Sequence, residues 1–236
     1  MTTSTESLVF LPGLICDHAL WREQMIAFST QFDCRVADLT GSETVGEMAQ
    51  SVLSDSPPRF NLAALSMGGY VAFEILRQAP ERVAKLALLN TKARPDSKDE
   101  TTRRKELLSA VGVGNFKGAT GRLLPLFIHE DRLSDEDLTA EIEQMAERVG
   151  KDAFVRQQKA ILSRPDSRPG LSRISCPTLV IGSRQDRLTP VDCHEEIAEG
   201  IPGSELIIIE DCGHLSPMEH PDRVTEELQG LFSESA

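Results

Sequence analysis

The sequence predicts an α/β fold in which a sheet of about six mostly parallel strands carries helices on both faces. Short apolar runs of strand length alternate along the chain with stretches of helical spacing, an order typical of βαβ units. The apolar runs show no alternation with polar residues, as expected for strands that helices cover on both sides. Of the 236 residues, 40% are hydrophobic and 26% are charged, which is typical of a globular domain.

The elements can be assigned in chain order. The apolar runs predict six strands at 8–11, 34–37, 60–65, 83–89, 178–182 and 205–209. Helical spacing of apolar residues predicts helices at 18–31, 44–54, 190–199 and about 221–232. A further helix follows residue 69 and runs to about Ala79, where Pro80 should end it.

One long stretch interrupts this alternation. Residues 96–172 begin with a charged segment, continue with several helical patterns and end in a loop rich in Pro, Ser and Arg, without a convincing strand. We expect a helical lid inserted between two strands of the sheet. The chain is therefore divided into a first part of the core at 1–95, the lid at 96–172 and a second part of the core at 173–236.

Charge and composition exclude several classes of function. The 25 Lys and Arg residues against 37 Asp and Glu give a formal net charge of -12, which argues against binding to nucleic acid. No apolar run approaches the roughly 20 residues of a membrane span, and the polar N-terminus does not resemble a signal peptide. The five cysteines form no zinc pattern, so we expect reduced thiols, a cytoplasmic protein and no metal.

Ser66 stands at the junction between a predicted strand and a predicted helix. The strand 60–65 runs directly into the turn 66–69, SMGG. A serine on so sharp a turn exposes its Oγ, and the residues two positions away on each side must be small. Ala64 and Gly68 are small, although glycine is usual at both positions. The turn predicts a nucleophilic serine, and the simpler alternative is a serine that caps the helix.

Two further residues lie just past predicted strands. His214 follows the last strand after a short loop, and Asp186 follows the strand before it. Taken alone, His214 is either a site residue or a surface histidine, and Asp186 is a turn or helix-capping residue. With Ser66 they give the chain order Ser, Asp, His at the carboxyl ends of parallel strands. Through these three motifs the chain resembles the α/β-hydrolase superfamily.

This resemblance covers roughly residues 8–232 and implies a role for each of the three side chains. Ser66 would be the nucleophile, and His214 would take its proton and pass it to the leaving group. Asp186 would hold the imidazole in the required tautomer. Asp96 is the alternative acid, because some relatives place the acid after the fourth predicted strand.

The resemblance also implies an oxyanion hole made of two main-chain N–H groups. One belongs to Met67, the residue after the nucleophile, and the other to Leu14 in the loop after the first predicted strand. Relatives often carry His-Gly in that loop, where this chain has Pro12-Gly13. Because the donor is a main-chain group, this difference should not remove it.

Other candidate residues have simpler interpretations. Cys16 is expected to be a small core residue, and Cys212 is expected to pack behind the loop that carries His214. Three histidines are expected at the surface: His129, His194 and His220. Four residues either line a pocket or pack in the core: Ile15, Trp21, Leu215 and Met218. Five cations either meet a substrate carboxylate or are solvated: Arg122, Arg132, Arg156, Lys159 and Arg187.

The sequence therefore predicts a cofactor-free serine hydrolase that acts on a small molecule. The scissile group is an ester, thioester, lactone or amide, and cleavage passes through an acyl-enzyme. The general resemblance is to small bacterial carboxylesterases and enol-lactonases. The alternatives on the same fold are acyl transfer, hydrolysis of a C–C bond, cofactor-free oxygen chemistry and a non-catalytic binder of small ligands. No nucleic acid, membrane or metal partner is expected.

Overall fold

The centre of the molecule is a single sheet of six parallel strands. The computed structural model describes residues 6–113 and 123–233. The strands are β1 (Ser7–Leu11), β2 (Asp33–Val36), β3 (Phe60–Leu65), β4 (Val83–Leu89), β5 (Thr178–Ser183) and β6 (Glu205–Ile209). Their order in the sheet is β2-β1-β3-β4-β5-β6. The predicted parallel sheet is confirmed, and the predicted strand bounds agree to within one residue.

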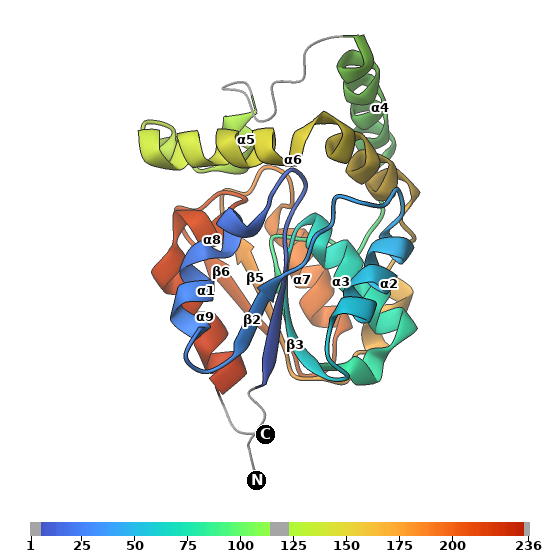
Figure 1. Cartoon of the computed structure of the whole chain (residues 1–236), viewed down its shortest axis with the longest axis vertical. Coiled ribbons are helices and arrows are strands. Elements are labelled where there is room, and N and C mark those ends of the chain that lie inside the picture. Colours follow the sequence, from blue (N-terminus) through green and yellow to red (C-terminus); the bar gives the residue numbers. More distant parts are fainter. Residues whose placement is uncertain (1–5, 114–122, 234–236) are drawn as a thin grey trace.

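Helices cover both faces of this sheet. On one face lie α1 (Arg22–Phe28) and α9 (Pro221–Ser233), and on the other α2 (Val45–Asp55), α3 (Met67–Gln78) and α7 (Val191–Gly200) (Figure 1). Successive residues of β1 pack against the helices of the two faces in turn, because side chains of a strand alternate between its faces. Leu8 and Phe10 pack in the first layer, and Val9 and Leu11 pack in the second. All four are fully buried or nearly so, which explains the uniformly apolar run.

Local capping signals account for the start of α2 and of the turn that precedes α1. Thr44 precedes α2 in extended conformation, and its hydroxyl accepts a hydrogen bond from the Glu47 N–H at 3.2 Å, a standard N-cap. The helix predicted over 18–31 is instead a short 3-10 turn, η1 (His18–Trp21), followed by α1. Asp17 caps that turn by accepting from the Ala19 N–H.

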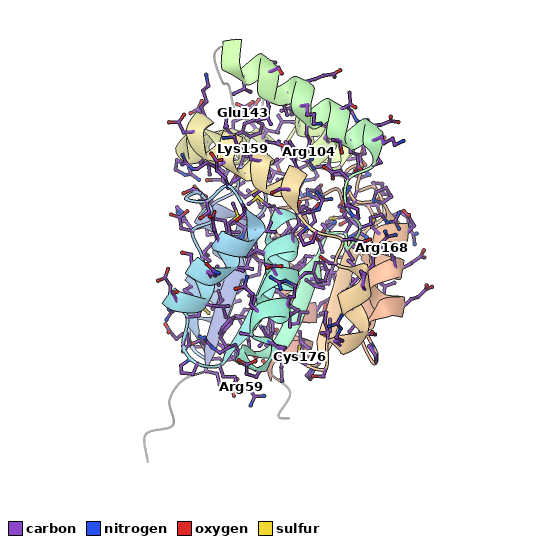
Figure 2. All side chains as sticks on the ribbon, turned by 90° about the vertical axis from the view of Figure 1, so that its right-hand side faces the viewer. Arg59, Arg104, Glu143, Lys159, Arg168 and Cys176 are labelled. Carbon is purple, nitrogen blue, oxygen red and sulfur yellow. The ribbon has the colours of Figure 1, made fainter. Side chains whose placement is uncertain are left out.

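A helical layer lies across the carboxyl ends of the strands. It consists of α4 (Lys98–Val113), α5 (Leu124–Phe127) and the long α6 (Glu136–Ser163), which is interrupted at Gly150 where φ is +77°. Figure 2 shows Arg104 and Lys159 within this layer, and Arg59 and Cys176 at the opposite end of the molecule. None of the described residues between 96 and 172 belongs to a strand. This placement puts the layer directly over the loops that follow the strands.

The remaining elements are short. They comprise η2 (Pro80–Arg82), η3 (Glu130–Arg132), η4 (Arg168–Arg173) and α8 (Ser216–Glu219). Among the helices of the described residues, none has the length and hydropathy required to cross a membrane.

Candidate active site

Ser66 occupies a strained turn between β3 and α3. Its φ of +55° lies in the left-handed region, which non-glycine residues seldom adopt. The turn is fixed on both sides, because the Ser66 N–H donates to the Leu89 carbonyl at 3.0 Å and the Ser66 carbonyl accepts from the Thr91 hydroxyl at 2.8 Å. A Cβ on Gly68 would lie 2.5 Å from the Leu11 carbonyl oxygen. Close approach of α3 to β1 therefore requires the glycine.

The structure brings Ser66, His214 and Asp186 together. The Ser66 Oγ lies 2.8 Å from His214 Nε2, and His214 Nδ1 lies 2.7 Å from Asp186 Oδ2. The three residues follow β3, β6 and β5, whose carboxyl ends share one edge of the sheet. His214 and Asp186 are only 3% and 5% exposed. The three side chains form one hydrogen-bonded series, largely shielded from water.

The surroundings of Asp186 keep its carboxylate ionised. Its Oδ1 accepts from the N–H groups of Leu188 and Thr189 at 2.8 and 3.0 Å, and its Oδ2 accepts from the Thr189 hydroxyl. Burial alone would raise the pKa of Asp186, but His214 and Thr189 lower it to about 2. The ionised carboxylate favours a proton on His214 Nδ1, so that Nε2 is free to accept the Ser66 proton.

Asn90 joins the acid loop to the histidine loop, and sequence reasoning did not identify it. It follows β4 with a φ of +44° and is completely buried. Its Nδ2 donates to Asp186 Oδ2 at 3.0 Å and to the Ser183 hydroxyl at 2.9 Å, and its Oδ1 accepts from the Ser216 hydroxyl at 2.6 Å. Only its position directly after a predicted strand could have pointed to it.

The main chain of the histidine loop is held by the helical layer. The N–H groups of His214 and Leu215 both donate to the Phe127 carbonyl at 2.9 Å. Glu219 accepts from the Gly213 N–H at 3.0 Å and from the His129 N–H at 2.6 Å. These contacts fix the position of the imidazole from two separate segments.

The two predicted oxyanion donors are on the loop after β1, for Leu14, and at the first residue of α3, for Met67. Leu14 lines the cavity into which Ser66 and His214 open. Met67 opens α3, so its N–H has no acceptor within its helix. Neither N–H donates to a protein acceptor within 6–113 and 123–233. Met67 is fully buried in the core and does not line the cavity, so any contact with a ligand would be made by its main-chain N–H.

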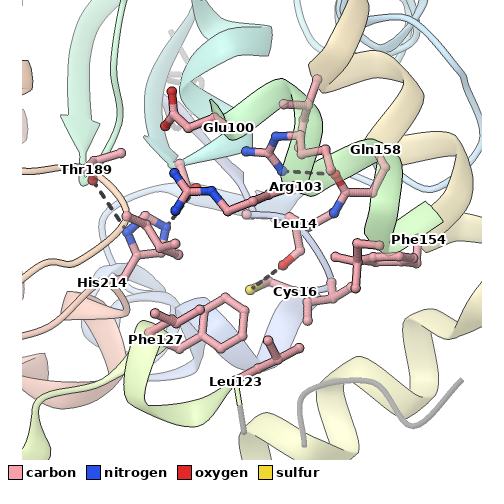
Figure 3. A pocket seen from close by; sticks show the side chains of 18 of the residues that line it. Leu14, Cys16, Glu100, Arg103, Leu123, Phe127, Phe154, Gln158, Thr189 and His214 are labelled. Carbon is pink, nitrogen blue, oxygen red and sulfur yellow. Dashed lines mark hydrogen bonds between the residues drawn. The ribbon is translucent and has the colours of Figure 1, made fainter. Parts of the chain in front are cut away.

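A cavity of about 800 Å³ separates Ser66 from the helical layer. Figure 3 shows Phe127, Leu123 and Phe154 on one side of this space, and Glu100 and Arg103 on another. Its apolar wall is formed mostly by the helical layer and includes Leu107, Val111, Leu123, Leu126, Phe127 and Phe154. Such a volume, with a largely apolar lining and some polar groups, suits a small organic ligand.

Asp96 does not contact His214. Its carboxylate binds Arg104 Nε at 2.6 Å, Arg164 Nη2 at 2.7 Å and Lys92 Nζ at 3.3 Å. Burial would raise the pKa of Asp96, but Arg164 and Arg104 lower it to about 2. Its partners are cations, so its side chain belongs to a different cluster from that of Asp186.

Cys16 and Cys212 behave as small core residues. Cys16 and Cys212 are both buried within the core. Burial raises the pKa of the Cys16 thiol to about 12 and that of Cys212 as well, so both thiols are protonated at neutral pH. Cys16 also lines the cavity, although a protonated thiol is a poor nucleophile.

The prediction that His194 lies at the surface is wrong. His194 is 0% exposed, and among the described residues neither of its ring nitrogens has a hydrogen-bond partner. It sits on α7 against Gly182 of β5, where an added Cβ would come within 2.7 Å of the ring. A helix that packs on the sheet buries one of its faces, and His194 is on that face. His129 and His220 are only partly exposed.

The other named residues divide between the cavity and the core. Ile15 and Leu215 line the cavity. Trp21 is instead fully buried, and its ring is tilted by 38° against that of Phe10, with the ring centroids 5.0 Å apart. Met218 is half-buried against the core.

Of the five predicted cations, Arg187 lines the cavity. Three others have different partners: Arg132 binds Asp135, Arg156 donates to the Thr40 carbonyl, and Lys159 binds Glu43. Arg122 lies outside the described residues. The cavity-lining cations Lys92, Arg103 and Arg104 were not identified from the sequence.

No metal centre is apparent in the part of the chain that the structure describes, because no three His, Cys, Asp or Glu side chains there are grouped to hold an ion.

Comparison with known proteins identifies the family. A model of the alpha/beta hydrolase family matches residues 8–227. The chain belongs to the alpha/beta hydrolase family. It is therefore an enzyme of the α/β-hydrolase type, and the fold around Ser66 agrees with this assignment.

Individual relatives share this fold over most of the chain. An esterase structure from Thermogutta terrifontis is 29% identical, with a TM-score of 0.85 over 95% of this chain and 88% of that one. A putative carbamate hydrolase, RutD, from Rhizobium rhizogenes is 29% identical over 94% of this chain and 91% of its own length.

A third relative matches over a shorter region. The 2-hydroxy-6-oxononadienedioate/2-hydroxy-6-oxononatrienedioate hydrolase of Klebsiella pneumoniae is 34% identical over 66% of this chain. The match spans 56% of the length of that relative.

Proposed function

We propose that this α/β-hydrolase is a cofactor-free serine hydrolase that cleaves a carboxylic ester or lactone of a small molecule. The observation that carries the proposal is the hydrogen-bonded series from Ser66 through His214 to Asp186, which opens on a largely apolar cavity. The series supplies a nucleophile, a base and a group that orients the base. We also propose that the helical layer over the cavity acts as a lid.

The first half of the reaction forms an acyl-enzyme. His214 Nε2 removes the proton from Ser66 as Oγ attacks the substrate carbonyl carbon, and the carbonyl oxygen becomes negatively charged. The N–H groups of Leu14 and Met67 donate to this oxygen. Asp186 stabilises the imidazolium without taking its proton. When the tetrahedral intermediate collapses, the bond to the leaving alkoxide breaks, and His214 gives it the proton.

The second half releases the acid. His214 removes a proton from a water molecule, whose oxygen attacks the acyl carbon. The new tetrahedral intermediate collapses, the bond between the acyl carbon and Oγ breaks, and Ser66 recovers its proton from the imidazolium. A lid over the cavity would exclude other water while the first acyl transfer takes place.

Of the two relatives that align along almost the whole chain, one is an esterase, which favours an ester, and the other is a putative carbamate hydrolase. The Thermogutta terrifontis structure is that of an esterase. The relative from Klebsiella pneumoniae supports hydrolysis of a C–C bond as the second candidate, because the same three side chains can serve that reaction. Thioesters and amides can undergo the same two acyl transfers.

Active-site labelling tests the proposal. A fluorophosphonate should add once to the protein at Ser66, and intact-mass analysis should find no adduct on Ser66→Ala. Turnover of a short-chain para-nitrophenyl ester should disappear in the same variant and should survive EDTA. Labelling at Cys16 in place of Ser66, or no labelling together with no ester turnover, would contradict the proposal.

A further inference from the structure

One edge of the cavity carries a group of charged side chains that the proposed reaction does not use. We call Lys92, Arg103 and Arg104 the cationic edge. All three line the cavity, and they lie at the end of β4 and on α4. They stand in a protein with a net charge of -12. A concentration of positive charge at this place is therefore not a feature of the whole surface.

Two of these cations have carboxylate partners. Lys92 contacts both Asp96 and Glu100, and Arg104 contacts Asp96. Arg104 also donates from Nη1 to the Gln158 side-chain oxygen at 2.9 Å. These bonds engage the polar atoms of Lys92 and Arg104 and hold both side chains in place.

Arg103 differs from its neighbours. Within the described residues, no carboxylate oxygen lies within 4.0 Å of its guanidinium, although it lines the same cavity as Ser66 and His214. In Figure 3, Arg103 lies in the part of the cavity between Glu100 and His214. Arg103 is exposed to solvent and also lines the cavity, so its guanidinium is accessible to a ligand.

The cationic edge and the charged residues that it contacts carry more positive than negative side chains. Asp96 also binds Arg164, which is buried on the ring of Tyr70. With Arg103 the cluster contains four cations and only two carboxylates, Asp96 and Glu100. Burial would raise the pKa values of both carboxylates, yet Arg104, Arg164 and Lys92 lower them. The shifts agree with a positive local potential.

We propose that the cavity binds substrates that carry a carboxylate away from the scissile carbonyl, and that Arg103 binds this carboxylate. This inference rests on the proposed function, because it names the class of ester or lactone that reaches Ser66. The apolar wall of Phe127, Phe154 and Leu107 holds the carbon chain between the two ends of the substrate. The N–H donors of the Arg103 guanidinium have no carboxylate partner among the described residues. A guanidinium can bind a carboxylate through two parallel hydrogen bonds.

A pair of esters tests this inference. The mono-para-nitrophenyl ester of adipic acid carries a terminal carboxylate, and its terminal carboxamide analogue has almost the same shape without the charge. We expect kcat/KM of the native enzyme to be about tenfold higher for the anionic ester, as one charge-assisted contact would give. The difference should lie mainly in KM, because the contact is made in both the ground state and the transition state.

Two variants assign the effect to one residue. Arg103→Gln should bring the ratio of the two kcat/KM values to about one. Lys105→Gln removes the same charge from α4 at an exposed side chain that does not line the cavity, and should keep the native ratio. Salt of about 1 M should lower the native ratio, because it screens an accessible charge. Fluorophosphonate labelling of Arg103→Gln checks that its site is intact.

The results separate the inference from the proposed function. Equal rates for the two esters in the native enzyme, or a native ratio that persists in Arg103→Gln, would overturn the carboxylate site. Turnover of the carboxamide ester with no preference for the carboxylate leaves the serine hydrolase in place and overturns only the inference. Absence of turnover for both esters, together with absence of labelling at Ser66, overturns both.

Discussion

Gln157 of α6 holds the loop that follows β1 by a direct hydrogen bond to Ile15. Its Oε1 accepts from the Ile15 N–H at 3.0 Å, and its Nε2 donates to the Leu39 carbonyl at 3.2 Å. Gln157 is completely buried. Ile15 has a φ of +55°, which is unfavourable for a β-branched residue. The bond stabilises a strained loop whose preceding residue, Leu14, carries a proposed oxyanion donor.

Gln157→Leu should therefore impair the chemical step. Leucine preserves most of the side-chain volume and removes both hydrogen bonds, so the loop can move away from its observed conformation. We expect kcat to fall by roughly 10–100-fold, as misplacement of a reacting group can cost this much, with little change in KM. Affinity for a boronic acid that mimics the tetrahedral intermediate should fall with kcat. Steady-state rates measured over a range of concentrations of one ester would give both kcat and KM.

Arg156→Met is the matched control for that variant. Arg156 also lies on α6 and donates from Nε to the Thr40 carbonyl at 2.7 Å, next to the Leu39 carbonyl that Gln157 binds. It has no contact with Ile15. Its substitution should leave kcat within about threefold of native. If both variants lost the same fraction of kcat, the general stability of α6, and not the Ile15 bond, would be responsible.

Asp186→Asn should reduce kcat much more than Asp96→Asn. Asparagine at 186 permits the wrong imidazole tautomer, so we expect a fall of about 10⁴-fold at neutral pH. Asp96 binds Lys92, Arg104 and Arg164 and does not touch His214, so its substitution should cost less than about tenfold for a neutral ester. A reversed order of the two rates would assign the acid to Asp96.

The strands and the Ser66 turn could be predicted because their signals are local. Strands covered on both faces need continuous apolar runs, and the close approach of α3 to β1 needs a small residue at Gly68. Asp186 and His214 were accessible for a related reason. In a parallel sheet, loops that follow neighbouring strands meet at one edge, so chain order alone predicted their proximity to Ser66.

Other features depend on contacts between distant segments. Asn90, Gln157 and Arg103 are ordinary polar residues in the sequence, and each acquires its position from the packing of helices and loops around it. The burial of His194 also depends on packing that the sequence does not show. Its helix was predicted correctly, but the polar type of the residue suggested the exposed face, and the packing of α7 against Gly182 buries it.

Asp96 should make the fold sensitive to acid. Its pKa in the folded protein is about 2, below the ordinary value of 3.8. The unfolded chain therefore binds the proton first as pH falls, so the stabilisation is complete above about pH 5 and is lost progressively toward pH 2. Asp96→Asn should lower the free energy of unfolding by about 2 kcal/mol at pH 7. Urea titrations should show this difference shrinking toward pH 2.

The exposed Asp99 on α4 provides the control for Asp96. Asp99→Asn removes the same charge from the same region without an ion pair among the described residues, and should change the free energy of unfolding by less than about 0.5 kcal/mol. A difference between native protein and Asp96→Asn that stayed constant from pH 7 to pH 2 would show that packing, and not ionisation, is lost.

The buried His194 should lower the free energy of unfolding over a higher pH range than Asp96 does. Burial lowers the pKa of His194 from 6.5 to about 4, with a smaller contribution from His214, although Asp186 opposes the shift. Between these values the unfolded chain binds a proton that the folded protein excludes. The free energy of unfolding should consequently decrease as pH falls from about 6.5 to 4, by about 3 kcal/mol in all.

His194→Leu isolates this contribution. Leucine has no titratable group, so the slope of the unfolding free energy between pH 6.5 and 5 should become much shallower, whatever the variant's stability at pH 7. His18→Gln removes a histidine whose side chain is 73% exposed, and should keep the native slope. Because the Asp96 contribution is nearly complete above about pH 5, the slope between pH 6.5 and 5 reports His194 separately from Asp96. A native slope in His194→Leu, or an imidazole pKa near 6.5 by NMR, would mean that water reaches the ring between α7 and β5.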